Sequence, residues 1–201
     1  MPGLYASPMA APHPNTSMMM LIVSAGPRTG KTTARLAFAR GMGLPGTSTS
    51  ELIAGVLEDE RGWPTGTVAK ARETDRDAYR EDLREVGDRI GKGRRPAIVR
   101  AIDAGYRVVD GCRRASELDA GIRRARKFGL EVWVVWIGGR PARGSDNTEA
   151  ERLHKRVTME IPNTTTVAEL DHAIESFLRD MDLLVPGVGA RPESGAGPEG
   201  D

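Results

Sequence analysis

The residues best suited to chemistry stand in a glycine-bearing turn and directly after it. Ala25 to Gly30 form the turn, and Lys31 and Thr32 follow. Successive backbone N–H groups in such a turn can curl around a phosphate, and a helix that starts near Lys31 adds the positive end of its dipole. The lysine would reach the β- and γ-phosphates of a nucleoside triphosphate, and the Thr32 hydroxyl would bind Mg²⁺. The sequence therefore predicts a site for ATP and Mg²⁺.

The segments around this turn fit a phosphate-binding loop, or P-loop. The apolar run from Met18 to Val23 predicts a buried strand before it, and apolar residues at helical spacing follow it. The usual pattern is G-x-x-x-x-G-K-[ST], and Ala25, which is also small, takes the place of the first glycine. We expect these residues to bind the nucleotide: Ala25, Gly26, Pro27, Arg28, Thr29, Gly30, Lys31, Thr32 and Thr33.

A second polar group follows a later predicted strand. The segment from Tyr106 to Val109 is typical of a short buried strand, and it ends at Asp110. A carboxylate at this place would hold Mg²⁺, or a water molecule bound to it, from a second side. Arg113, on the following loop, would stabilise negative charge on the transferred phosphoryl group. The alternative is that Asp110 only caps the next turn.

Further arginines occur in two other segments. Arg140 and Arg143 lie in a Gly/Arg loop, and we expect them to belong to a lid over the phosphates. Arg72, Arg76 and Arg80 recur every four residues, which predicts a basic stripe on one helix face. Such a stripe would bind the phosphate of an acceptor, although a solvated, salt-bridged helix has the same pattern.

The elements that must position these residues alternate between strand and helix. Strands are predicted over 18–23, 106–109, 130–137 and 157–161, and helices from about 31 and over 50–57, 74–90, 96–102, 116–128, 148–155 and 167–181. This order predicts an α/β class of fold, the P-loop NTPase fold, with a mostly parallel sheet and helices on both faces. Because ligands of such sheets bind at the carboxyl ends of the strands, the P-loop, Asp110 and the 162–166 loop should meet at one edge.

Composition limits the remaining possibilities. A chain of 201 residues suits one domain, which we place at 18–185 between a disordered leader, 1–17, and a disordered tail, 186–201. The net charge of +1 argues against coating nucleic acid through bulk charge, but it permits a local basic groove. Cys112 is the single cysteine, so an internal disulfide is impossible and we expect a reducing, cytoplasmic location. No apolar run is long enough to suggest a membrane partner.

With these motifs in place, the chain resembles the P-loop nucleotide kinases, in particular the deoxynucleoside monophosphate kinases of bacteriophages. The likeness extends over most of residues 18–182, through YREDLREVGDRIG at 79–91, VVDGCRRASELDAGIRRARKFG at 108–129, SDNTE at 145–149 and PNTTTVAEL at 162–170. It implies that Asn163 and Thr164 lie near the adenine of ATP. Two features depart from it: many members have Asp where this chain has Thr32, and the region 43–78, which should define the acceptor, has no secure counterpart.

The resemblance implies a Mg²⁺-dependent kinase that transfers the γ-phosphoryl group of ATP to a nucleotide, and we expect a (deoxy)nucleoside monophosphate. A related group of phage kinases phosphorylates 5-hydroxymethyluracil within DNA. That acceptor would benefit from a carboxylate base, for which Glu51, Asp75 and Asp110 are candidates. A nucleotide-binding module without an acceptor is the remaining alternative. If a phage encodes the chain, the location would be the host cytoplasm; a homodimer is left open.

Overall fold

The computed structural model of the protein describes residues 17–26, 29–75, 77–93, 95–138, 148–163 and 166–185. Its strands form one five-stranded parallel sheet in the order β2-β3-β1-β4-β5. They are β1 (Met18–Val23), β2 (Gly46–Ser48), β3 (Val108–Asp110), β4 (Glu131–Ile137) and β5 (Met159–Ile161). The predicted tail, and the predicted leader apart from Ser17, lie outside the described residues.

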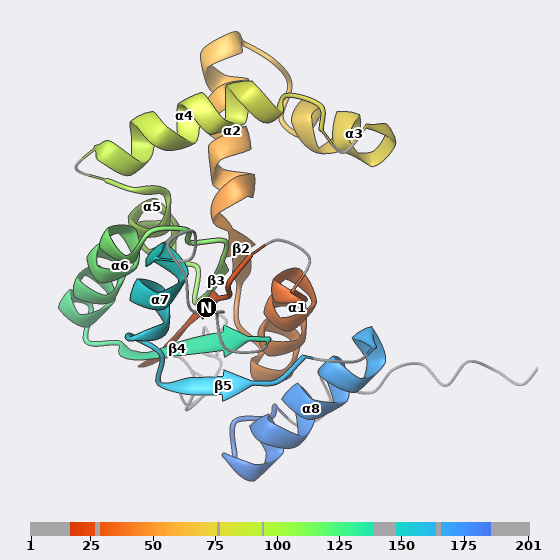
Figure 1. Cartoon of the computed structure of the whole chain (residues 1–201), viewed down its shortest axis with the longest axis vertical. Helices are drawn as coiled ribbons and strands as arrows, with labels where there is room; N and C mark the ends of the chain where they lie inside the picture. Colours follow the sequence, from red (N-terminus) through yellow and green to blue (C-terminus); the bar gives the residue numbers. More distant parts are fainter. Residues whose placement is uncertain are drawn as a thin grey trace, which may run out of the picture.

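Helices cover both faces of the sheet (Figure 1). They are α1 (Lys31–Met42), α2 (Thr49–Arg61), α3 (Thr67–Thr74), α4 (Arg80–Lys92), α5 (Ala97–Asp103), α6 (Ala115–Lys127), α7 (Thr148–His154) and α8 (Val167–Asp180). One apolar cluster joins the sheet to α5, α6 and α7, and a second joins the other face to α1 and α8. Alternate residues of β1 enter the two clusters, which explains why this strand is apolar throughout. The predicted α/β class with a parallel sheet is confirmed.

Helices α2, α3 and α4 form an arm that stands away from the sheet, and we call residues 49–92 the arm (Figure 1). The arm has an apolar cluster of its own, built around Leu57, Val68, Val86 and Ile90. Glu58 of α2 is only 4% exposed. Its two carboxylate oxygens accept hydrogen bonds from the backbone N–H groups of Gly66 and Val68, at 2.9 and 2.8 Å. A buried carboxylate thus joins α2 to the start of α3.

The predicted continuous helix over 74–90 is wrong. Helix α3 ends at Thr74, where Asp75 accepts a hydrogen bond from the N–H of Asp77, and α4 begins only at Arg80. Between them Tyr79 has a φ of 59°, which a helix does not permit. Arg72 therefore lies on α3 and Arg80 on α4, so the predicted basic stripe on one helix face is also wrong.

Two smaller features of the fold were not predicted: a very short strand, and the contact that holds the start of α6. Strand β2 was not predicted, because three residues are too few to show a period. Helix α6 begins at Ala115 and has no side-chain cap of its own; instead the N–H of Ala115 donates to Glu149 of α7, at 2.5 Å. None of the helices in the described ranges combines the length and apolar character that crossing a bilayer demands.

Candidate active site

The P-loop connects β1 to α1, and its last residue needs glycine. Gly30 has a φ of 88°, and a Cβ atom placed on it would lie 2.5 Å from Nδ2 of Asn163 and 2.7 Å from Leu170. The amide of Asn163 donates a hydrogen bond of 2.8 Å to the carbonyl oxygen of Thr29. The loop after β5 is therefore packed directly against the P-loop, as expected for loops at one edge of a parallel sheet.

Lys31 lies inside the P-loop, and its ammonium group is held by loop atoms. Its Nζ donates to Oγ of Ser24 at 2.6 Å, to the carbonyl of Gly26 at 2.5 Å and to Oγ1 of Thr29 at 3.3 Å. Burial lowers the pKa of Lys31 from its usual value; Asp110 opposes this change, and Arg113 adds to it. The charges of Asp110 and Arg113 thus act on the lysine that is expected to bind phosphate.

Asp110 ends β3 and lies beside Ile22 of β1 and Ser48 of β2. It is only 3% exposed, and its Oδ1 has no hydrogen-bond partner among the described residues. Burial raises the pKa of Asp110, the positive charge of Arg35 works against that, and the Glu51 carboxylate adds to the rise. Asp110 is thus a buried carboxylate with an uncommitted oxygen at the carboxyl edge of the sheet.

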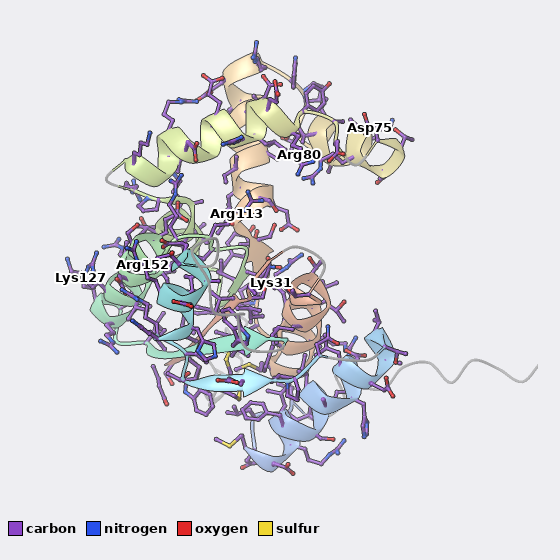
Figure 2. All side chains as sticks on the ribbon, viewed as in Figure 1. Lys31, Asp75, Arg80, Arg113, Lys127 and Arg152 are labelled. Carbon is purple, nitrogen blue, oxygen red and sulfur yellow. The ribbon has the colours of Figure 1, made fainter. Side chains whose placement is uncertain are left out.

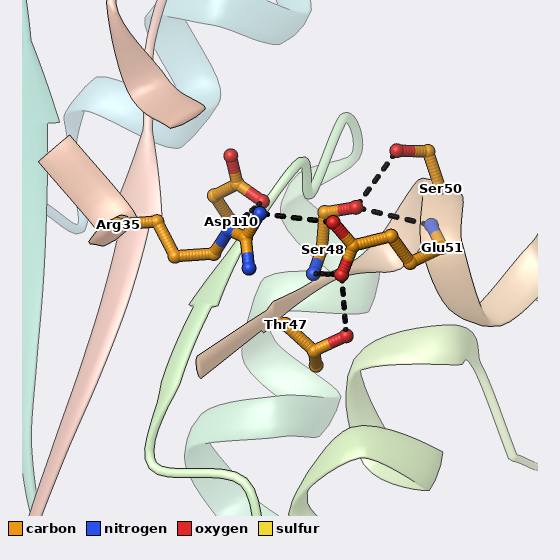
Figure 3. Close-up of polar contacts among 6 residues, drawn as sticks. All are labelled: Arg35, Thr47, Ser48, Ser50, Glu51 and Asp110. Atoms are coloured by element: carbon orange, nitrogen blue, oxygen red, sulfur yellow. Dashed lines mark hydrogen bonds and ion pairs between the residues drawn. The ribbon is translucent and has the colours of Figure 1, made fainter. Parts of the chain in front are cut away.

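Arg35 of α1 lies between two carboxylates (Figure 3). Its Nη2 donates to Oε1 of Glu51 at 2.9 Å, and its Nε is 3.5 Å from Oδ1 of Asp110. The other oxygen of Glu51 accepts from Oγ1 of Thr47 and from the N–H of Ser48, while Ser48 accepts from the N–H of Glu51. This reciprocal capping box at the start of α2 fixes the Glu51 carboxylate.

These residues fit the magnesium ion that a triphosphate requires. Mg²⁺ keeps several waters and takes only one or two protein carboxylates together with phosphate oxygens. Asp110 offers such a carboxylate, and Thr32 stands exposed in the first turn of α1. Within the described ranges, no group of three or more His, Cys, Asp or Glu side chains is placed to hold a metal ion by itself.

The predicted arginines fall into three groups. Arg113 is exposed and lies with Lys31 at the end of the sheet, whereas Arg80 lies on the arm (Figure 2). Arg80 pairs with Asp77 at 3.1 Å, and both side chains are exposed; Arg72 is exposed on α3. Several predicted residues lie outside the part of the chain that the structure describes: Pro27, Arg28, Arg76, Arg140, Arg143 and Thr164.

Two residues of the site escaped the sequence analysis. The Ser24 hydroxyl accepts hydrogen bonds from Thr29 and Lys31. The feature of the sequence that could have identified Ser24 is its position directly between β1 and the P-loop. In the sequence, Arg35 alternates with apolar residues, which is typical of a solvent-facing position on an amphipathic helix, yet it is 8% exposed while its neighbour Leu36 is 54% exposed. Its spacing of four from Lys31, which puts both on one helix face, was the only local sign.

Comparisons with known proteins add little. No protein-family model matches the chain, and a search of the curated proteins finds no match. The chain is similar to the crystal structure of a shikimate kinase from Aquifex aeolicus, with 13% sequence identity, a TM-score of 0.38, and coverage of 82% of this chain and 96% of that one. It is also similar to a protein from Chloroflexus aurantiacus that is provisionally assigned as a kinase, with 16% identity, a TM-score of 0.44, and coverage of 82% and 97%. Because both scores are low, the function has to be argued from the site.

Proposed function

We propose that this protein is a Mg²⁺-dependent kinase that transfers the γ-phosphoryl group of ATP to a nucleotide, in the first place a (deoxy)nucleoside monophosphate. One observation carries the proposal: Lys31, the first residue of α1, is held by Ser24 and Gly26 directly after β1, and the buried Asp110 ends the adjacent strand β3. At this shared edge of the sheet the charge of each group opposes the change that burial makes in the pKa of the other. A phosphate-binding cation beside an uncommitted carboxylate is the arrangement that a magnesium–triphosphate complex needs.

Each residue has a simple role in this proposal. Lys31 would bind the β- and γ-phosphates, and backbone N–H groups of the P-loop would bind the phosphate oxygens. Thr32 and Asp110 would hold Mg²⁺, which neutralises charge between the phosphates when it is bound. In the transfer step an oxygen of the acceptor forms a bond to the γ-phosphorus as the bond from the γ-phosphorus to ADP breaks. Arg113 would stabilise the negative charge on the phosphoryl group during this step. Catalysis would then consist of positioning and electrostatics.

The arm supports the choice of a kinase over a simple nucleotide-binding module. It rises from the carboxyl end of β2, next to Asp110, and so stands at the edge where an acceptor would have to lie. The exposed Arg113 suits an anionic acceptor such as a monophosphate, whereas Arg61, Arg80 and Arg89 of the arm pair with acidic side chains of the arm.

A hydroxyl acceptor in DNA would need a carboxylate base, and the three candidates differ. Both oxygens of Glu51 are committed to Arg35, Thr47 and Ser48. Asp75 lies on the arm and caps its own turn. Asp110 has a buried oxygen without a hydrogen-bond partner among the described residues, but this carboxylate is already assigned to Mg²⁺. No contact therefore favours the DNA acceptor over the free monophosphate.

The proposal is tested by measuring ADP formation from ATP and Mg²⁺ against a panel of acceptors. The panel holds each NMP and dNMP, free nucleosides, and duplex DNA with and without 5-hydroxymethyluracil. Turnover with one or a few monophosphates supports the proposal and names the base. Phosphate transferred only to the modified DNA would replace the acceptor, and slow hydrolysis that no acceptor accelerates would leave a nucleotide-binding module.

A further inference from the structure

The burial of Arg35 requires an explanation, because a guanidinium that leaves water is costly unless it is paired. Helix α1 exposes Leu36 and buries Arg35, the reverse of an ordinary amphipathic helix. The contacts of Arg35 are two carboxylates from two other elements, Glu51 of α2 and Asp110 of β3. Arg35 therefore lies where its positive charge balances the negative charges of these two carboxylates.

The two contacts differ in kind. The bond to Glu51 is a normal hydrogen bond of 2.9 Å, and Glu51 is itself fixed by Thr47 and Ser48. The approach to Asp110 is 3.5 Å from Nε to Oδ1, and neither atom has a hydrogen-bond partner among the described residues. Arg35 thus balances the charge of Asp110 without occupying the lone pairs of Oδ1 in a directed hydrogen bond.

We propose that Arg35, anchored by Glu51, is a positioning residue that keeps the Asp110 carboxylate in place for the magnesium ion of the bound nucleotide. This inference rests on the proposed function, since it assumes that the P-loop binds a magnesium–nucleotide complex. The capping box of α2 fixes Glu51, Glu51 holds Arg35, and Arg35 in turn holds Asp110. The start of the arm is thereby linked to the metal-binding side chain.

The test is the affinity for ADP, measured by calorimetry with excess Mg²⁺ and again with EDTA. The ratio of the two dissociation constants is the magnesium gain. Arg35→Met should keep the affinity for metal-free ADP within about threefold and lose the magnesium gain by about tenfold or more, an amount that corresponds to roughly 1.4 kcal/mol. Arg35→Lys should keep part of the gain. Arg40→Met is the matched control: Arg40 lies on the same helix but pairs with Asp171 and Glu175, so the gain should stay as in the wild type.

A double-mutant cycle separates positioning from a general structural effect. Asp110→Asn should lose the magnesium gain, and adding Arg35→Met to it should cause no further loss. Additive losses, or an unchanged gain in Arg35→Met, would overturn the inference. If Arg35→Met fails to fold, Glu51→Gln replaces it and should reduce the gain by about threefold or more, because its neutral amide holds the guanidinium less strongly.

The result also distinguishes this inference from the proposed function. A wild-type protein that binds no ADP, or shows no magnesium gain, would overturn both. A wild-type protein with a magnesium gain that the Arg35 variants share would overturn only the positioning role.

Discussion

The side-chain amide of Asn163 donates a 2.8 Å hydrogen bond to the carbonyl oxygen of Thr29 and so ties the loop after β5 to the P-loop. The two residues are far apart in the sequence, and their meeting follows from the parallel sheet, which brings loops after β1 and β5 to one edge. Asn163 thereby supports the shape of the P-loop at the turn that leads into Gly30 and α1.

Asn163→Ala should weaken nucleotide binding, because the P-loop would then have to be ordered when the nucleotide binds. Loss of one partly buried hydrogen bond costs about 1 kcal/mol, which corresponds to roughly a fivefold increase in the dissociation constant for ADP. Calorimetry with magnesium and ADP measures this change. Thr166→Ala is the control, since Thr166 only caps α8 and should lower the thermal midpoint without changing the affinity. Equal affinities of Asn163→Ala and the wild type would show that the loop keeps its shape unaided.

Lys31→Met should abolish phosphoryl transfer while the protein stays folded. The ammonium is the charge expected to bind the β- and γ-phosphates, and loss of such a contact lowers turnover by about 100-fold or more. Methionine keeps most of the volume, so circular dichroism should show a folded protein with a cooperative melt. Lys155→Met, an exposed lysine after α7, is the comparison and should keep full activity. Full activity of Lys31→Met would refute the P-loop assignment.

Glu58→Ala should destabilise the arm. Its buried carboxylate accepts two backbone hydrogen bonds at the start of α3, and removing them should cost about 3 kcal/mol in the free energy of unfolding. Urea denaturation measures the loss, and hydrogen exchange should show the N–H groups of Gly66 and Val68 exchanging faster. The exposed Asp59 provides the control, because Asp59→Ala removes a similar charge beside it and should change stability little. Slow exchange at both sites in Glu58→Ala would contradict this role.

Cys112 should resist alkylation in the folded protein. Burial raises the pKa of its thiol to about 12, and the nearby Glu117 carboxylate adds to the effect. Only the thiolate reacts with iodoacetamide. At a pH close to the pKa of an unperturbed thiol, Cys112 of the native protein should therefore be modified roughly a thousandfold more slowly than Cys112 of the unfolded chain. Mass spectrometry with and without denaturant measures both rates. Fast modification without denaturant would mean that the loop after β3 opens readily.

Much of the fold follows from patterns within short windows of the sequence. The apolar run of β1, the helical spacing of apolar residues after Lys31, and the β-branched and aromatic run of β4 each predict an element, and the structure confirms these elements. Patterns of this kind fail where an element is very short, as at β2, or where a turn interrupts a charged stretch, as between α3 and α4. In the second case the spacing of Arg72 and Arg80 continued a helical period that the backbone does not follow.

The sequence by itself determined the P-loop motif and its place between a strand and a helix, because the turn, the lysine and the threonine are contiguous and the motif can be read within a short window. Only the tertiary structure decided the environment of Asp110. The charges around it come from α1 and α2, and Arg35 is indistinguishable from a surface arginine until the sheet brings β2 and β3 together. Whether a charged side chain is buried depends on partners that the fold supplies from distant positions, and no local period records them.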